Sequence, residues 1–166
     1  MPDMLVKLYA LPDERPDIER LAQEGIKIRR VQPYEASVLK RFVLANFSEV
    51  WADEAGRSFS FQPVSCIIAT HEKQIVGFGC YDTTCRGFFG PTGVLESYRG
   101  KGIGKALLLA CLRAMRESGY GYAIIGGAGP MKFYEKAVGA VEIPGSVPGI
   151  YTDMLKREAG GVTSNA

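Results

Sequence analysis

The stretch 93-GVLESYRGKGIGKALLLACLRAM-115 decides the fold. A segment with strand character runs into a loop and then into a long apolar segment with helical periodicity. The loop contains three glycines, Gly100, Gly102 and Gly104, and three cations, Arg99, Lys101 and Lys105. The first turn of a helix has about four unpaired backbone N–H groups, and the helix dipole makes it positive. Because glycines let an anion approach those groups closely, the junction predicts a site for a diphosphate.

Two familiar phosphate-binding spacings fit this loop poorly. A G-x-x-x-x-G-K-S/T loop would need a glycine at Arg99 and a hydroxyl at Ala106. A dinucleotide fingerprint needs G-x-G-x-x-G, whereas the glycines here follow G-x-G-x-G, and Tyr122 stands where a ribose-binding acid is expected. The spacing that does fit is Arg-x-x-Gly-x-Gly, over residues 99–104.

The rest of the chain predicts one α/β domain with a mixed sheet. Strands are expected near residues 4–11, 26–31, 64–70, 75–81, 87–95 and 122–128. Helices are expected near residues 16–25, 33–51, 105–118 and 130–138, with a loop over 52–63. Two closing strands are expected, "AVEIPG" and "GIYTDML". Antiparallel hairpins followed by a strand–helix–strand crossover favour a mixed sheet with helices on both faces.

Composition restricts the class of protein. The 166 residues suit one domain, and a net charge of +2 is too small for a general nucleic-acid or membrane binder. The prolines and acids near the start do not resemble a signal peptide, so we expect a cytoplasmic protein. The four cysteines form no C-x-x-C pair and the single histidine has no motif around it, so no metal site is expected.

The loop and a later segment together resemble the GNAT superfamily of N-acetyltransferases. "VLESYRGKGIGKALL" resembles the acetyl-CoA pyrophosphate loop of that family, and "KFYEKAVGA" resembles its later F-Y-E-K-x-G-F segment. The resemblance covers about residues 26–156, with residues 1–25 as an N-terminal arm packed on the domain and 157–166 as a C-terminal tail. It implies a mostly antiparallel sheet in which one splayed strand pair holds CoA.

The resemblance also implies roles for individual residues. Val94 and Leu95 match positions whose backbone binds the pantetheine arm of acetyl-CoA. The pyrophosphate matches the loop residues Arg99, Gly100, Lys101, Gly102, Ile103, Gly104 and Lys105. Tyr134 matches a tyrosine near the cofactor sulfur, and its neighbour Phe133 is expected in the core. A phenol of pKa about 10 can donate a hydrogen bond to a departing thiolate, whereas full proton transfer would be uphill by ~2 kcal/mol.

The sequence does not identify a general base. Family members often place a glutamate in the strand before the loop, but residues 87–93 contain no acid. Glu96 is too close to the pyrophosphate end, and Asp82 and His71 border neighbouring strands. A relay through water and a less basic amine are equally open.

The acceptor is equally undetermined. Phe47 and Trp51 are spaced to line a substrate mouth or to pack in the core, and Glu49, Asp53 and Glu54 suit either a cationic amine or a solvated helix end. We expect acetyl transfer from acetyl-CoA to a primary amine of a small molecule. Another acyl donor, a hydroxyl acceptor and a non-catalytic acyl-CoA sensor are the alternatives, and both a monomer and a homodimer are open.

Overall fold

The computed structural model describes residues 1–157, so residues 158–166 of the expected tail lie outside it. Seven strands form one sheet in the order β2-β3-β4-β5-β6-β1-β7. The strands are β1 (Met4–Lys7), β2 (Ile26–Arg30), β3 (Cys66–His71), β4 (Gln74–Tyr81), β5 (Phe88–Val94), β6 (Tyr122–Ile125) and β7 (Val141–Glu142). All neighbours are antiparallel except β5 and β6, which are parallel. The expected α/β fold with a mostly antiparallel sheet is confirmed.

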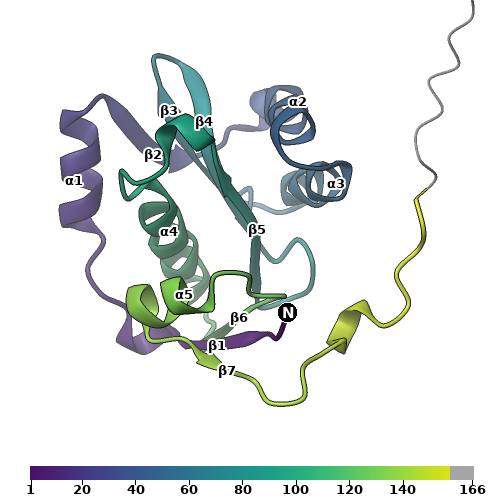
Figure 1. Ribbon diagram of the computed structural model, residues 1–166. Coiled ribbons are helices and arrows are strands. Elements are labelled where there is room, and N and C mark those ends of the chain that lie inside the picture. The colour runs from purple at the N-terminus through teal and green to yellow at the C-terminus, as the bar shows by residue number, and fades with distance from the viewer. Residues whose placement is uncertain (158–166) are drawn as a thin grey trace, which may run out of the picture.

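Helices cover both faces of this sheet (Figure 1). They are α1 (Arg15–Gln23), α2 (Ala36–Asn46), α3 (Glu49–Arg57), α4 (Ile103–Glu117) and α5 (Met131–Val138). The alternation of side chains along β3 explains the two layers. Cys66 and Ile68 belong to the apolar cluster under α2 and α3, whereas Ile67 and Ala69 belong to the cluster under α4.

The N-terminal residues are part of the sheet. β1 lies between β6 and β7, with Met4 opposite Ile125 on one side and Glu142 on the other. The side chains of Met4 and Val6 are fully buried. The N-terminal arm expected over residues 1–25 therefore begins with a strand that joins β6 to β7.

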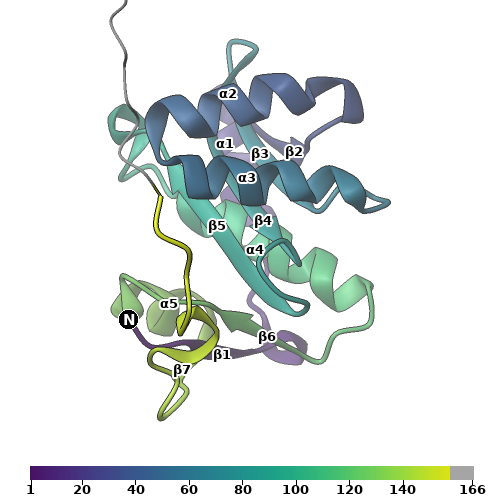
Figure 2. The ribbon, with the colours of Figure 1, turned by 90° about the vertical axis from the view of Figure 1, so that its right-hand side faces the viewer.

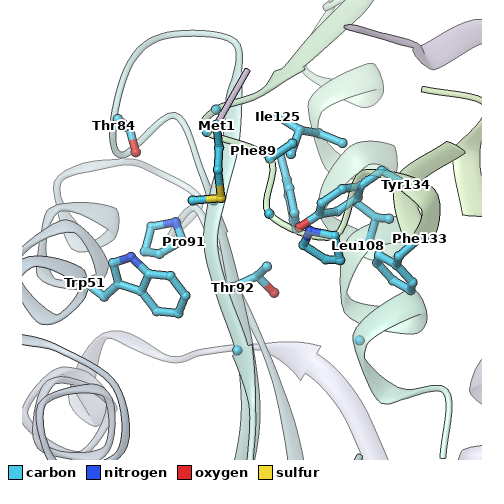
Figure 3. Close-up of a pocket in the computed structure, with 18 of the residues that line it drawn as sticks. Met1, Trp51, Thr84, Phe89, Pro91, Thr92, Leu108, Ile125, Phe133 and Tyr134 are labelled. Atoms are coloured by element: carbon cyan, nitrogen blue, oxygen red, sulfur yellow. The ribbon is translucent and has the colours of Figure 1, made fainter. Parts of the chain in front are cut away.

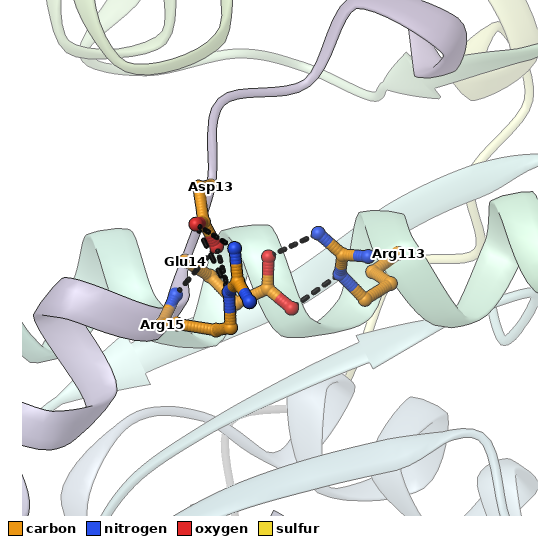
Figure 4. A network of polar contacts seen from close by, with 4 residues as sticks. All are labelled: Asp13, Glu14, Arg15 and Arg113. Atoms are coloured by element: carbon orange, nitrogen blue, oxygen red, sulfur yellow. Dashed lines mark hydrogen bonds and ion pairs between the residues drawn. The ribbon is translucent and has the colours of Figure 1, made fainter.

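A bidentate ion pair ties the start of α1 to α4 (Figure 4). The carboxylate of Glu14, which is 8% exposed, binds the guanidinium of Arg113. The neighbouring Asp13 accepts hydrogen bonds from Arg15, and these lower the pKa of Asp13 to about 2. The ion pair between Glu14 and Arg113 therefore holds the start of α1 against α4.

Two of the predicted elements differ from those in the structure. The single helix expected over residues 33–51 is two helices, because Ser48 is extended and its Oγ accepts a hydrogen bond from the backbone N–H of Trp51. α3 then continues to Arg57, into the expected loop. The expected closing strand "GIYTDML" is instead irregular after a 3₁₀ turn, Gly149–Tyr151, where Gly149 adopts a positive φ of 58°.

The chain after β7 crosses to the other half of the molecule. Figure 2 shows this yellow segment leaving the region of β7 and passing β5 toward α3. Arg157 forms ion pairs with Glu49 at 2.8 Å and with Asp53 at 3.2 Å, both on α3. We call residues 144–157 the C-terminal segment.

Candidate active site

Strands β5 and β6 diverge, and a cavity of about 1130 Å³ lies along the gap. The two strands pair only where Phe88 and Phe89 lie opposite Ile124 and Ile125. Beyond that point β5 continues to Val94 without a partner on this side. The cavity follows β5 from Phe88 to Val94 and reaches the N-terminus of α4.

The free edge of β5 presents backbone groups to this gap. Leu95 donates its N–H to the carbonyl of Val76 on β4 and accepts a bond from Tyr98, so both of its backbone groups are used. Because antiparallel strands alternate the side to which they bond, Thr92 and Val94 turn their backbone toward the gap. The carbonyl of Val94 accepts a weak hydrogen bond from Arg99 Nε at 3.4 Å. Val94 lines the cavity and Leu95 does not.

The glycine loop closes one end of the cavity. Gly100 and Gly102 have φ of 80° and 85°, a left-handed conformation that side chains rarely adopt. Gly102 caps α4, and a Cβ there would lie 2.6 Å from Arg20 Nη2. Gly100, Gly102, Ile103 and Gly104 line the cavity and leave the first N–H groups of α4 accessible.

The cations of this loop have partners that the sequence did not reveal. Lys105 Nζ lies 2.9 Å from Asp17, and Lys101 Nζ lies 3.4 Å from Glu24, both acids being in or directly after α1. Arg20 donates to the carbonyl of Lys101 at 2.9 Å. Lys105 and Arg99 line the cavity, whereas Lys101 does not. The loop is therefore less positive than its own residues imply.

Tyr134 lies across the gap from β5 (Figure 3). Its side chain is 6% exposed, and its hydroxyl has no hydrogen-bond partner among residues 1–157. Burial raises the pKa of Tyr134 above its ordinary value of 10, so the phenol stays protonated near neutral pH. Phe133 is 37% exposed and lines the cavity, so the expectation that it belongs to the core was wrong.

The candidate bases from the sequence lie elsewhere. His71 Nδ1 is 2.9 Å from the hydroxyl of Tyr98, and Asp82 accepts bonds from Gly87 N–H and the Tyr120 hydroxyl. Neither residue lines the cavity, and Glu96 does not line it either.

The carboxylate that does reach the cavity belongs to Glu54 on α3. Among the described residues that line the cavity, it is the only acid. Thr84 Oγ1 donates a hydrogen bond to Glu54 Oε1 at 2.5 Å. Sequence reasoning placed Glu54 near the mouth but could not separate it from Glu49 and Asp53.

Sequence comparison assigns the chain to a family. The family described as "Acetyltransferase (GNAT) family" matches residues 34–140, which is most of the chain. The chain belongs to the GNAT acetyltransferase family. This confirms the resemblance to the GNAT superfamily, and acetyl-CoA is the cosubstrate of GNAT acetyltransferases. No curated protein is similar enough in sequence to count as a relative.

Solved structures show the same GNAT fold. A GCN5-related glucosamine N-acetyltransferase region of a fungal multi-domain β-N-acetylglucosaminidase aligns over 86% of this chain, with 16% identity and a TM-score of 0.69. A GCN5-related N-acetyltransferase from Sphaerobacter thermophilus aligns over 86%, with 20% identity and a TM-score of 0.60. The chain spans 19% and 48% of the lengths of these two proteins. Among the described residues of this GNAT chain, no helix is both long and apolar enough to cross a membrane.

Proposed function

We propose that this protein is an N-acetyltransferase that moves the acetyl group of acetyl-CoA to a primary amine of a small molecule. One observation carries the proposal: a single cavity joins the glycine loop to Tyr134, whose hydroxyl has no partner among the described residues. Its volume of about 1130 Å³ exceeds the roughly 300–1,000 Å³ that suits one small ligand. An extended ligand that reaches from the glycine loop to Tyr134 therefore fits this cavity.

The loop and β5 are suited to the two parts of the donor. The N–H groups at the start of α4, with Arg99 and Lys105, would bind the pyrophosphate. The free backbone of Thr92 and Val94 would bind the pantetheine amides, much as an added strand would. We also expected Leu95 and Lys101 at this site. The backbone groups of Leu95 and the ammonium group of Lys101 already have partners within the protein, so these two residues would position their neighbours rather than bind the donor directly.

The proposed chemical step is direct. Attack of the amine nitrogen on the thioester carbon forms a C–N bond and breaks the C–S bond, giving an amide and a thiol, while the nitrogen loses a proton. Tyr134 would donate a hydrogen bond to the departing sulfur. Because burial raises the pKa of Tyr134, complete proton transfer to a thiolate is unfavourable, and hydrogen-bond stabilisation is the role we assign.

We assign removal of the amine proton to water. An alkyl amine of pKa near 10.4 is mostly protonated at pH 7, and exposing its lone pair costs about 4.6 kcal/mol. β5 supplies no carboxylate, and neither His71 nor Asp82 lines the cavity.

The test is release of CoA thiol from acetyl-CoA in the presence of a panel of primary amines, with the acetylated product identified by mass spectrometry. We expect turnover that depends on both substrates. Binding of acetyl-CoA without turnover across the panel would favour a non-catalytic acyl-CoA sensor. Turnover with hydroxyl acceptors, or only with longer acyl-CoA donors, would redirect the proposal within the acyltransferases.

A further inference from the structure

We infer that the acceptor is a monocationic amine with a flat apolar body, and that Glu54 binds its ammonium group. The inference rests on the proposed acetyl transfer and adds the chemical class of the second substrate. It concerns the part of the cavity near Phe88, at the opposite end of β5 from the glycine loop. We call this part the acceptor end, and it is lined by Trp51, Glu54, Thr84, Phe88, Pro148 and Tyr151.

Glu54 differs from the two other acids of α3. Glu49 and Asp53 form ion pairs with Arg157, and Asp53 also pairs with Lys40. Among the described residues, no cation pairs with Glu54. Thr84 donates to Oε1, and Oε2 has no hydrogen-bond partner among residues 1–157. A half-buried carboxylate without a counter-ion beside a cavity favours a bound cation, because a charge-assisted hydrogen bond would offset the cost of its burial.

The side-chain charges of the cavity disfavour anionic acceptors. The cationic side chains that line it, within the described part of the chain, are Arg99 and Lys105, and both belong to the loop end. A carboxylate or phosphate next to the reacting amine would therefore meet Glu54 without a compensating cationic side chain. Amino acids and sugar phosphates are disfavoured by this arrangement, whereas a single ammonium group is favoured.

The remaining walls are aromatic or apolar. Trp51 stacks on Phe47, with ring centroids 5.7 Å apart and an interplanar angle of 30°, which fixes its orientation. Figure 3 shows Trp51 and Pro91 on the side of β5 away from Tyr134. Aromatic faces attract both a flat body and an ammonium group.

The C-terminal segment supplies the wall that faces α3. A Cβ at Gly126 would lie 2.8 Å from the hydroxyl of Tyr151, so this glycine makes room for the tyrosine. Burial first, and then the charges of Asp3 and Glu54, raise the pKa of Tyr151. Its phenol therefore stays neutral near pH 7.

Glu54 is suited to binding rather than to removing the proton. With the proton leaving through water, as proposed above, the charge of Glu54 would act on binding of the ammonium group by a charge-assisted hydrogen bond. Loss of its charge should therefore raise KM for the amine more than it lowers kcat.

Four probes separate the features of the acceptor: 2-phenylethylamine, L-phenylalanine with an added carboxylate, ethylamine without the flat body, and 2-phenylethanol without the charge. We expect 2-phenylethylamine to have the highest kcat/KM, by about tenfold or more over each of the others. Calorimetric binding to the CoA-bound protein gives the same comparison without turnover.

The variant Glu54→Gln removes the charge and keeps an acceptor for Thr84. We expect KM and Kd for 2-phenylethylamine to rise about 10- to 100-fold, while kcat and the Kd for CoA change less than about threefold. Glu117→Gln, at the exposed end of α4, is the matched control and should leave all four values unchanged. Tyr151→Ala should reduce the ratio of kcat/KM for 2-phenylethylamine to kcat/KM for ethylamine.

The outcomes distinguish this inference from the proposed function. If 2-phenylethylamine binds without turnover and Glu54→Gln weakens that binding, the acceptor class stands and acetyl transfer is wrong. If the protein acetylates amines but prefers L-phenylalanine or ethylamine, or if Glu54→Gln leaves binding unchanged, the acceptor class is wrong and acetyl transfer stands. A fall in kcat alone would overturn the binding role of Glu54.

Discussion

The two ends of the cavity are built in different ways. The loop end comes from one continuous stretch, from Val94 to Lys105, and it presents mainly backbone N–H groups. The acceptor end combines side chains from α3, the turn before β5 and the C-terminal segment, with Glu54 and Tyr151 far apart in sequence. Backbone groups at a helix N-terminus suit a ligand part common to all donors, whereas side chains from several segments suit a particular acceptor.

Charge is also distributed differently between the ends. The loop cations Lys101 and Lys105 are paired with acids of the α1 region, whereas Glu54 at the acceptor end has no ion-pair partner among residues 1–157. Ligand binding at the loop end should thus depend less on side-chain charge than the sequence of the loop indicates. Ligand binding at the acceptor end should depend on the single charge of Glu54. Four substitutions test this contrast, and they follow from the largest expected effect to the smallest.

Gly104→Glu should weaken CoA binding about 1000-fold, or about 4 kcal/mol, with little change in Tm. The new carboxylate would replace the open first turn of α4 with a negative charge where the pyrophosphate is proposed to bind. A Cβ at this position has ordinary contact with Val94 at 3.8 Å, so the fold should tolerate it. Calorimetry with CoA measures the loss.

Gly104→Ala is the matched control, and its CoA affinity should fall far less than that of the glutamate variant. Unchanged CoA affinity in a folded Gly104→Glu protein would remove the pyrophosphate from this loop.

Tyr134→Phe should lower kcat about 100-fold, or about 2.7 kcal/mol, and leave the Kd for CoA within threefold. The reason is that only the departing sulfur would use the lost hydroxyl. Steady-state kinetics and calorimetry provide the two values. Turnover within about threefold of the natural protein would make Tyr134 a packing residue.

Two controls accompany this variant. Tyr122→Phe changes a tyrosine that is 52% exposed outside the cavity and should leave kcat unchanged. Because the pKa of Tyr134 is raised above 10, deprotonation of this residue should not reduce kcat of the natural protein below about pH 10.

Thr84→Val should raise KM for the amine about fivefold and leave CoA binding unchanged. The substitution removes the hydrogen bond that orients Glu54, at a cost of about 1 kcal/mol. Thr84→Ser keeps the hydroxyl and should restore KM. An unchanged KM in Thr84→Val would show that this hydrogen bond does not orient Glu54.

Asp17→Asn should strengthen CoA binding two- to threefold at low salt, because Lys105 loses its partner and its charge becomes available. The side chains of Lys105 and Asp17 are 39% and 21% exposed, so an effect of about 0.5 kcal/mol is expected. The gain should disappear at high salt. Glu19→Gln, an exposed acid on α1, is the control, and weaker binding by Asp17→Asn would mean that Asp17 positions Lys105 instead.

The elements that sequence reasoning placed correctly are those with strong local signals. The glycines and the apolar face of residues 103–117 predicted α4 and the loop, and the valine- and isoleucine-rich segments predicted β3 and β4. The errors lie where long-range contacts overrule local pattern. "GIYTDML" alternates like a strand, yet β1 already occupies the edge of β6, and the segment crosses to α3.

The sequence alone determined the family and the fold class. It also predicted the loop that we propose for acetyl-CoA, because free N–H groups and positive φ angles follow from residues adjacent in the chain. Only the tertiary structure decided which charges are available. It paired Lys105 with Asp17 and directed Glu54, rather than Asp53, into the cavity. The availability of a charge depends on what packs opposite it, and those contacts join segments that are distant in sequence.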